Sequence, residues 1–299
     1  MNLVIGATGL LGGEICRQLR QAGKPVRALT RATADPVKVE RLKRSGATLV
    51  QGDLKDRASL DAACRGVATV ITTASTTFSR QAGDSIQTVD LDGQVRLVDA
   101  AKAAGVSRFV YVSYSHQINV DCPLTTAKRS VEAHLQQSGM TFTILAPSVF
   151  MEVWLSPALG FDPGNGSARV YGSGEAKISY ISAFDVAGFA VVAATKEYSD
   201  KNTILEIGGP DALSQLQAVL IFEQALGISV QLDSLSEQAL QQQHSSSDPL
   251  QKTFAALMLG CAKGDVISGA RALAEQYGIS LRSVMEYAAH LRAQQLRVA

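Results

Sequence analysis

The first thirteen residues constrain the fold more than any other stretch, because an apolar run there turns directly into a glycine-rich segment. Residues 3–5 (LVI) predict a buried strand, and the apolar spacing after Gly9 predicts an amphipathic helix. Between the two, Gly6, Gly9 and Gly12 follow a Gly-x-x-Gly-x-x-Gly spacing. Missing side chains permit a tight turn and let a pyrophosphate approach the backbone at a helix N-terminus. We therefore predict a dinucleotide site; the alternative is a purely structural glycine turn.

Composition indicates an ordinary soluble globular protein. The 299 residues are 46% hydrophobic and 18% charged with a net charge of +1, which gives no electrostatic case for binding nucleic acid or an anionic membrane. No apolar run approaches the roughly 18 residues of a membrane span, and no basic leader precedes the first strand. We therefore expect a cytoplasmic protein. The four cysteines are far apart without a C-x-x-C pair, so we expect reduced structural thiols and no metal site.

Strand and helix patterns alternate along the first half of the chain, which predicts an α/β fold with a doubly wound, mostly parallel Rossmann sheet. The further strands are expected at 25–31, 48–50, 68–72, 108–113 and 141–145. From residue 150 the pattern changes to shorter strands and helices, with a loose polar connection expected at 241–247. We predict a nucleotide-binding domain over 1–150. A smaller C-terminal α+β lobe over 151–299 would bind the substrate and send segments back to the main domain.

The second predicted strand ends at Thr30 and Arg31, where this fold selects its cofactor. No acid stands there to bind ribose hydroxyls, and the planar guanidinium of Arg31 suits a 2′-phosphate, which favours NADP(H) over NAD(H). The alternative is a solvent-facing arginine. Asp53, beside Leu54, is expected either at the adenine end of the cofactor or as the cap of the next helix.

Two further segments end strands at the expected ligand crevice. Residues 73–75 (TAS) are small enough for a cofactor to pass close to the backbone, and residues 76–84 predict a mobile loop at the site mouth. Residues 113–116 (SYSH) follow the fifth strand at its carboxyl end. The nucleotide-binding residues predicted in this way are Gly6, Thr8, Gly9, Leu10, Leu11, Gly12, Arg31, Asp53, Leu54, Thr73, Ala74, Ser75 and Ser113.

In these motifs the chain resembles the NmrA-like branch of the atypical short-chain dehydrogenases/reductases. The resemblance rests on residues 6–12, 26–31, 105–113, Lys128 with 131–132, 138–139, Pro147 with 150–152, and 180–182 with 185–187. It implies a Rossmann fold and a family that includes NADPH-dependent quinone oxidoreductases, triphenylmethane reductases and isoflavone-reductase-like enzymes. The family also includes regulators that bind the nucleotide without turning it over. The resemblance further implies that Lys128 bonds the nicotinamide ribose, with Pro147 and Phe150 near the cofactor; a helix-surface lysine is the alternative.

The chain departs from the usual catalytic pattern at Leu124. Typical short-chain dehydrogenases place a tyrosine four residues before the lysine, so that the ammonium lowers the pKa of the phenol. Here Tyr114 and His116 are candidate substitute proton donors, although either side chain could be incidental. Another departure is Ala146, which stands where many relatives have an arginine before the proline; this weakens the transfer of roles around Pro147.

Three aromatic residues, Phe150, Trp154 and Tyr180, are expected to line a flat apolar pocket for an aromatic acceptor, or else to be plain core. Our leading hypothesis is an NADPH-dependent oxidoreductase that transfers hydride to a quinone-like or other aromatic acceptor, with Lys128 and Tyr114 as catalytic residues. The alternative is a non-catalytic NADP(H)-sensing protein, and a weaker third is an epimerase or dehydratase acting on a nucleotide sugar. Expected partners are the small substrate and either a homodimer or a regulatory protein, without nucleic acid or membrane.

The Arg31→Ala variant tests the cofactor assignment. If Arg31 holds the 2′-phosphate, the substitution weakens binding of NADPH and leaves binding of NADH unchanged, since NADH lacks that phosphate. Titration of both cofactors against the purified variant measures this. An equal loss of affinity for the two would contradict the 2′-phosphate role.

Overall fold

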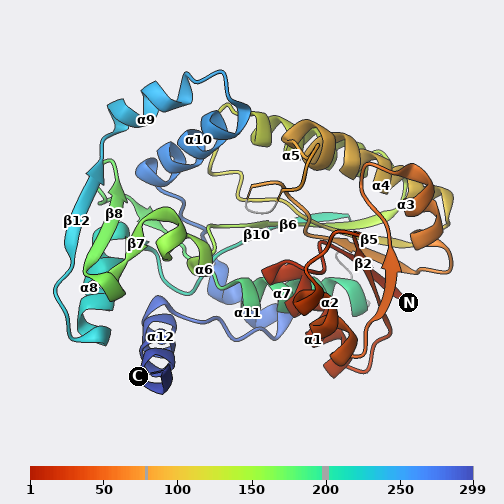
Figure 1. Ribbon diagram of the computed structural model, residues 1–299, viewed down its shortest axis with the longest axis horizontal. Coiled ribbons are helices and arrows are strands. Elements are labelled where there is room, and N and C mark those ends of the chain that lie inside the picture. The colour runs from red at the N-terminus through yellow and green to blue at the C-terminus, as the bar shows by residue number, and fades with distance from the viewer. Residues whose placement is uncertain (78–79, 197–201, 299) are drawn as a thin grey trace. The chain divides into compact units, whose positions relative to one another are not determined.

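The computed structural model describes residues 1–77, 80–196 and 202–298, and the chain divides into two compact units (Figure 1). Unit 1 comprises Met1–Ser113, Pro123–Ala146 and Val186–Leu205, and unit 2 comprises Tyr114–Cys122, Pro147–Asp185 and Glu206–Ala299. The chain passes between the units several times. The predicted assignment of nucleotide binding to 1–150 and of substrate binding to 151–299 stays a prediction.

The centre of unit 1 is a seven-stranded sheet in the order β10-β6-β5-β4-β1-β2-β3. Its strands are β1 (Asn2–Ile5), β2 (Val26–Thr30), β3 (Thr48–Gln51), β4 (Thr69–Thr72), β5 (Arg108–Val112), β6 (Thr141–Pro147) and β10 (Thr203–Ile207). The pairings of β1 with β2 and β4, of β2 with β3, and of β5 with β4 and β6 are all parallel. The chain leaves β1 toward β3 and later returns on the other side through β4. The ends of β1 and β4 therefore form the switch point where open parallel sheets bind ligands.

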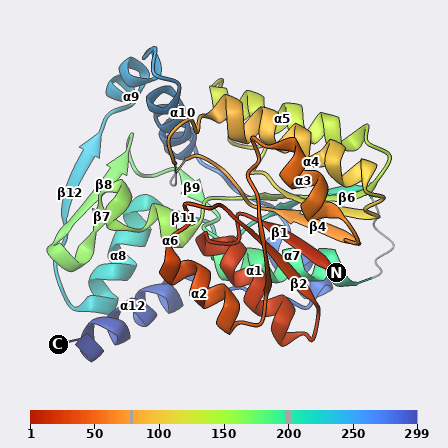
Figure 2. The same ribbon diagram turned by 45° about the vertical axis from the view of Figure 1, so that its right-hand side comes forward.

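Helices cover both faces of this sheet. In Figures 1 and 2, α3, α4 and α5 lie on one face, and α1 and α7 lie on the other. The helices of unit 1 are α1 (Leu10–Gln21), α2 (Pro36–Arg44), α3 (Arg57–Cys64), α4 (Asp92–Ala103), α5 (Pro123–Gln136) and most of α7 (Ala183–Thr195). This arrangement confirms the predicted doubly wound fold.

The hydrophobic pattern explains the packing of unit 1. Ile15 and Leu19, four residues apart on α1, are fully buried, as the spacing predicted. A large apolar cluster joins the sheet to its helices through Leu3, Val70, Phe109 and Ile144. These strands read as continuous apolar runs because both faces of a parallel sheet are covered.

Helix α4 begins with an unusual turn. A π-helical turn, η1 (Ile86–Leu91), precedes it, and Ser85 caps that turn by accepting the N–H of Thr88 at 3.1 Å. Gln94, on the first turn of α4, is fully buried. Its Oε1 accepts the Thr72 hydroxyl at 3.0 Å and its Nε2 donates to the Ala74 carbonyl at 3.0 Å. Gln94 therefore holds the loop that leaves β4.

Unit 2 contains a three-stranded sheet in the order β12-β8-β7 and a small β11-β9 pair, with helices around them (Figure 2). Its strands are β7 (Phe161–Asp162), β8 (Ser167–Tyr171), β9 (Lys177–Ile178), β11 (Leu213–Ser214) and β12 (Gln231–Leu235). Its helices are α6 (Met151–Trp154), η2 (Pro157–Leu159), η3 (Pro163–Asn165), α8 (Gln215–Leu226), α9 (Glu237–His244), α10 (Pro249–Lys263), α11 (Ala270–Tyr277) and α12 (Val284–Val298). An apolar cluster around Phe222 and Tyr287 forms its core.

The prediction of a loose connection at 241–247 is wrong for the first half of this segment. Residues 241–244 belong to α9. Ser236 caps the N-terminus of this helix, because its hydroxyl accepts the N–H of Ala239 at 3.2 Å. Leu240 anchors this otherwise polar helix because its side chain is fully buried. Helix α11 was likewise not predicted from the sequence.

All four cysteines lie in described residues, are buried and form no disulfide. Burial raises the pKa of Cys16 to about 12. Burial is also the main cause that raises the pKa of Cys64 to about 11, so both thiols stay protonated. Among the described helices none is long and apolar enough to span a bilayer. The predicted cytoplasmic location stays a prediction.

The Asp185→Asn variant tests a buried carboxyl at the start of α7. Burial raises the pKa of Asp185 to about 6, against the opposing effect of the Arg282 N–H bond at 2.7 Å. The folded state therefore binds a proton that the unfolded state releases, and stability falls as pH rises from about 4 through about 6. Above about pH 6 we expect the ionised Asp185 to lower the free energy of unfolding by up to about 3 kcal/mol, and we expect no such decrease in the variant. Urea unfolding between about pH 4 and pH 6 measures this free energy. Parallel pH profiles for the two proteins would contradict the prediction.

The Gln94→Leu variant tests how the β4 loop is held. The substitution leaves the buried Thr72 hydroxyl and the Ala74 carbonyl without the amide partner, so we expect a loss of about 2–4 kcal/mol in the free energy of unfolding. Gln87→Leu, on the exposed side of η1, is the matched control and should stay within about 0.5 kcal/mol. Denaturant titration compares the two. Similar values for both variants would show that Gln94 does not hold the loop.

Candidate functional site

Glycines bring three segments of unit 1 together at the end of β1. Gly6 has a φ of +79°, which favours glycine, and a Cβ there would lie 2.6 Å from the Thr73 Oγ1 and 2.9 Å from the Ala74 nitrogen. A Cβ on Gly12 would lie 2.2 Å from the Gly6 carbonyl oxygen. Thr73 secures the contact, since its N–H and its hydroxyl both donate to the Ile5 carbonyl, at 3.1 and 3.2 Å. The structure therefore brings together the glycine turn and the β4 loop that the sequence predicted.

The first turn of α1 is open at its N-terminus. Gly9 is the N-cap, and no side chain caps the helix. The N–H of Gly13 bonds back to the Gly9 carbonyl at 3.0 Å, while Leu10 is 50% exposed. The N–H groups of a helix's first turn carry partial positive charge and bind phosphates when no side chain satisfies them. These residues fit the pyrophosphate of a dinucleotide.

Arg31 lies in an ion-pair cluster of unit 1. Its Nη1 lies 2.6 Å from the Asp84 Oδ2, and the Lys55 ammonium bonds the other oxygen of the same carboxylate. Burial alone would raise the pKa of Asp84, but hydrogen bonds from Lys55, the Gln81 N–H and Arg31 hold it below its usual value. Arg31 is therefore partly buried and ion-paired, and its role at the 2′-phosphate stays a prediction. The sequence analysis missed Lys55 and Asp84, and no local pattern links Arg31 to a residue 53 positions away.

Asp53 does not cap the next helix. Its Oδ1 accepts the Lys55 N–H at 2.8 Å, whereas Asp56 is the N-cap of α3 and accepts the Ala58 N–H at 3.0 Å. Leu54 is buried in the apolar cluster of unit 1. Their roles at the adenine end stay predictions. In the predicted loop 76–84, residues 78–79 lie outside the described residues, and the mobility of the loop stays a prediction.

Lys128 lies inside unit 1. Only 5% exposed, it donates from Nζ to the Val112 carbonyl at 3.1 Å and lies 5.0 Å from the centre of the Tyr111 ring. Burial lowers the pKa of its ammonium, although Asp90 and Glu132 act in the opposite direction. The helix-surface alternative is therefore wrong. A buried lysine with a lowered pKa is typical of functional sites.

Ser113 lies at the end of β5 in a buried polar network. Its hydroxyl donates to the Glu132 carboxylate and accepts from the Arg129 guanidinium at 3.1 Å. Leu124, in the position of the usual catalytic tyrosine, is 4% exposed and packs in the interior. The helix that carries Lys128 therefore offers no phenol at that position.

His116, in unit 2, has a carboxylate partner. Its Nδ1 and the Glu206 carboxylate form a hydrogen bond, and its backbone N–H donates to the same oxygen at 3.2 Å. Such a carboxylate fixes the tautomer and the orientation of an imidazole. The pairing spans 90 residues, so the sequence could not reveal it. Tyr114 is partly buried and packs against the apolar cluster of unit 2.

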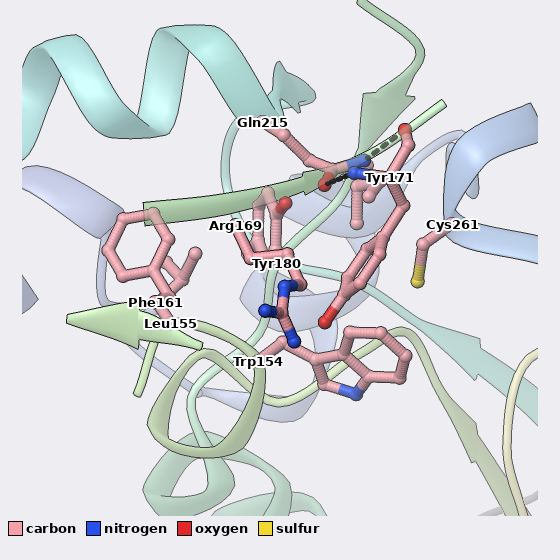
Figure 3. Close-up of a pocket in the computed structure, with 9 residues that line it drawn as sticks. Trp154, Leu155, Phe161, Arg169, Tyr171, Tyr180, Gln215 and Cys261 are labelled. Carbon is pink, nitrogen blue, oxygen red and sulfur yellow. Dashed lines mark hydrogen bonds between the residues drawn. The ribbon is translucent and has the colours of Figure 1, made fainter. Parts of the chain in front are cut away.

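Two of the three predicted aromatic residues line one pocket of unit 2 (Figure 3). Trp154 meets Tyr171 edge to face, with ring centres 5.9 Å apart. The cavity has a volume of only about 10 Å³, and its lining is Trp154, Leu155, Phe161, Arg169, Tyr171, Ile178, Tyr180, Gln215 and Cys261. Phe150 instead pairs with Ile181 through a backbone bridge. Pro147 accepts the Ser115 N–H at 2.8 Å.

Three comparisons place these features among known proteins. The chain is 33% identical over 245 residues to an NAD(P)H azoreductase of Xenophilus azovorans, covering 81% of this chain and 79% of that protein. It is 29% identical over 238 residues to the photosystem II assembly factor Ycf39 of Trieres chinensis, covering 78% and 71%. An NADPH-dependent quinone oxidoreductase of Escherichia coli, solved with NADPH, superposes with a TM-score of 0.78 at 25% identity, covering 97% and 99%.

The family model agrees with the resemblance found in the motifs. It matches residues 2–265, which include the glycine turn, Arg31, Lys128 and Glu206. Together with the fold, this match confirms the predicted family: the chain belongs to the NmrA-like family.

Proposed function

We propose that this protein is an NADPH-dependent oxidoreductase that transfers hydride to a quinone-like or other aromatic acceptor. The observation that carries the proposal is the open N-terminus of α1 beside Gly6 and Gly12, which fits a pyrophosphate. The similarity to an azoreductase and to a quinone oxidoreductase complexed with NADPH supports both the cofactor and the acceptor class.

The nucleotide would lie along the carboxyl edge of the unit 1 sheet. Leu10, Leu11 and Gly12 offer their N–H groups to the phosphates, and Arg31 offers its guanidinium to the 2′-phosphate. The small residues 73–75 leave the backbone accessible beside Gly6. When bound, the cofactor supplies the hydride.

Lys128 would hold the nicotinamide ribose and stabilise negative charge on the reduced acceptor. One of the three donors on its Nζ goes to the Val112 carbonyl, and burial strengthens the interaction of the ammonium with any oxygen it meets. A quinone accepts hydride readily. The Lys128 ammonium near a quinone oxygen would therefore take the place of the tyrosine hydroxyl that is missing because residue 124 is Leu124.

The substrate residues predicted from the sequence lie in unit 2. Tyr180 belongs to the apolar core of unit 2 and Trp154 packs against that core, and the cavity beside them, about 10 Å³, is too small for an aromatic acceptor unless side chains move. His116, held by Glu206, is the proposed proton donor, because an imidazole paired with a carboxylate can give and take a proton. Tyr114 is the weaker donor, since its side chain packs against the apolar cluster of unit 2.

A second candidate function is a nucleotide-binding protein that signals or assembles through a partner. Two observations favour it. Leu124 replaces the usual phenol and is buried, and the chain is similar to a photosystem II assembly factor. Such a protein would need the same phosphate turn but no acceptor chemistry.

Turnover of NADPH with a panel of quinones, an azo dye and a triarylmethane dye separates these functions. We expect oxidation of NADPH with at least one acceptor class, and a fall in kcat of about 100-fold or more in Lys128→Met, because the charge that stabilises the reduced acceptor is removed. Lys102→Met, at an exposed position of α4, is the matched control and should retain wild-type rates.

Binding of NADPH measured on the same preparations completes the test. Tight binding without turnover for any acceptor would contradict the reductase and favour the second candidate. Turnover unaffected by Lys128→Met would contradict the role of Lys128 while leaving the reductase in place.

A further inference from the structure

A carboxylate of the chain itself occupies a two-cation site in unit 1. The Asp84 side chain is 1% exposed, although Arg31 and Lys55, which bind it, are 27% and 30% exposed. Arg31 Nη1 and the Gln81 N–H both reach Oδ2, at 2.6 and 2.9 Å, and the Lys55 ammonium bonds Oδ1. Each oxygen therefore receives a cationic donor, the pattern by which proteins also bind phosphate.

This cluster lies where the fold reads the adenosine ribose. Arg31 directly follows β2, Lys55 follows β3, and the two strands are parallel neighbours, so both cations stand at the same edge of the sheet. In dinucleotide-binding folds an acid near the end of β2 binds the ribose 2′-hydroxyl of NAD(H), and an arginine there accommodates the 2′-phosphate of NADP(H). Here the arginine comes from β2, and the acid comes from the segment after β4.

The position of Asp84 is held by its neighbours. Gly83, with a φ of +79°, forms the turn before it, and the Asp84 N–H donates to the Gln81 carbonyl at 3.0 Å. Gln81 in turn bonds the Thr33 carbonyl through Nε2 at 3.3 Å, and Ser85 begins the capped turn η1. The turn before Asp84 and the capped turn after it therefore both hold the carboxylate in place.

The carboxylate has opposite effects on the two cofactors. A 2′-phosphate needs the positive charge of Arg31 and Lys55, which Asp84 already neutralises in part, and it adds negative charge beside a buried carboxylate. A 2′-hydroxyl instead needs an acceptor, which a carboxylate supplies. Binding of NADPH must therefore displace or repel Asp84, whereas binding of NADH need not.

We propose that Asp84 is a specificity-determining residue that lowers the preference for NADPH over NADH, because it binds Arg31 and Lys55. In this proposal Lys55 is a second residue that binds the 2′-phosphate. The proposal rests on the proposed nucleotide-binding function. It assigns to Asp84 and Lys55 roles that the glycine motif and Arg31 alone do not reveal.

The test measures dissociation constants by calorimetry for NADPH, NADH, 2′,5′-ADP and 5′-AMP, which needs no turnover. The Asp84→Asn variant keeps an oxygen for the Gln81 N–H but removes the charge. We expect it to raise the preference for NADPH over NADH by about tenfold or more, mainly through tighter NADPH binding, and to do the same for 2′,5′-ADP over 5′-AMP. Asp61→Asn removes a charge from an exposed pair with Arg57 and serves as the matched control.

The Lys55→Gln variant tests the site without altering Asp84. We expect it to weaken binding of NADPH and 2′,5′-ADP by about tenfold while NADH and 5′-AMP are unchanged. An unchanged preference in Asp84→Asn, or equal weakening of both cofactors in either variant, would overturn the proposal and leave the cluster as a purely structural contact. Failure of the wild-type protein to bind either cofactor would instead overturn the proposed function.

Discussion

The close approach of Gly6 and Gly12 is the constraint on which the rest of unit 1 depends. A single added Cβ on Gly12 would come within 2.2 Å of the Gly6 carbonyl, so α1 can start directly over the end of β1 only because no side chain intervenes. That start leaves the first turn of α1 open. Thr73 then bonds the Ile5 carbonyl, which draws the β4 loop against the same turn. The open first turn of α1 and the meeting of the β1 and β4 ends therefore both depend on the close packing around Gly6.

Local patterns in the sequence were enough to predict six of the seven strands of the main sheet and the helix that follows Gly9, but they did not assign β10 to this sheet. Short apolar runs bounded by glycine or polar residues mark β1 through β6. The inner strands have no polar side because both of their faces are covered, whereas the edge strand β3 is only partly buried. Helix α9 escaped prediction for the converse reason. It is almost wholly polar, and Leu240 is its one fully buried anchor.

The candidate site was predictable only where its residues act through the backbone or a motif. The glycines and Lys128 could be located from the sequence, but the burial of Lys128 arises from the packing of α5 and could not be read from its spacing. The partners of Arg31 and His116 lie 53 and 90 residues away. Such pairings depend on which loops meet at the edge of a sheet, and no periodicity encodes that. Charge-assisted contacts between loops are for this reason the least predictable part of the site.

The π-helical turn η1 ties the segment that carries Asp84 to the interior of unit 1. A π-turn holds one residue more than an α-turn, and here it lies between the Ser85 cap and the start of α4. Ile86, Val89 and Asp90 of this turn are buried, and Val89 belongs to the apolar cluster of unit 1. Deletion of one residue from the turn would therefore displace core side chains as well as the carboxylate that precedes them. The geometry of the turn and the ion pairs of Asp84 can for this reason change only together.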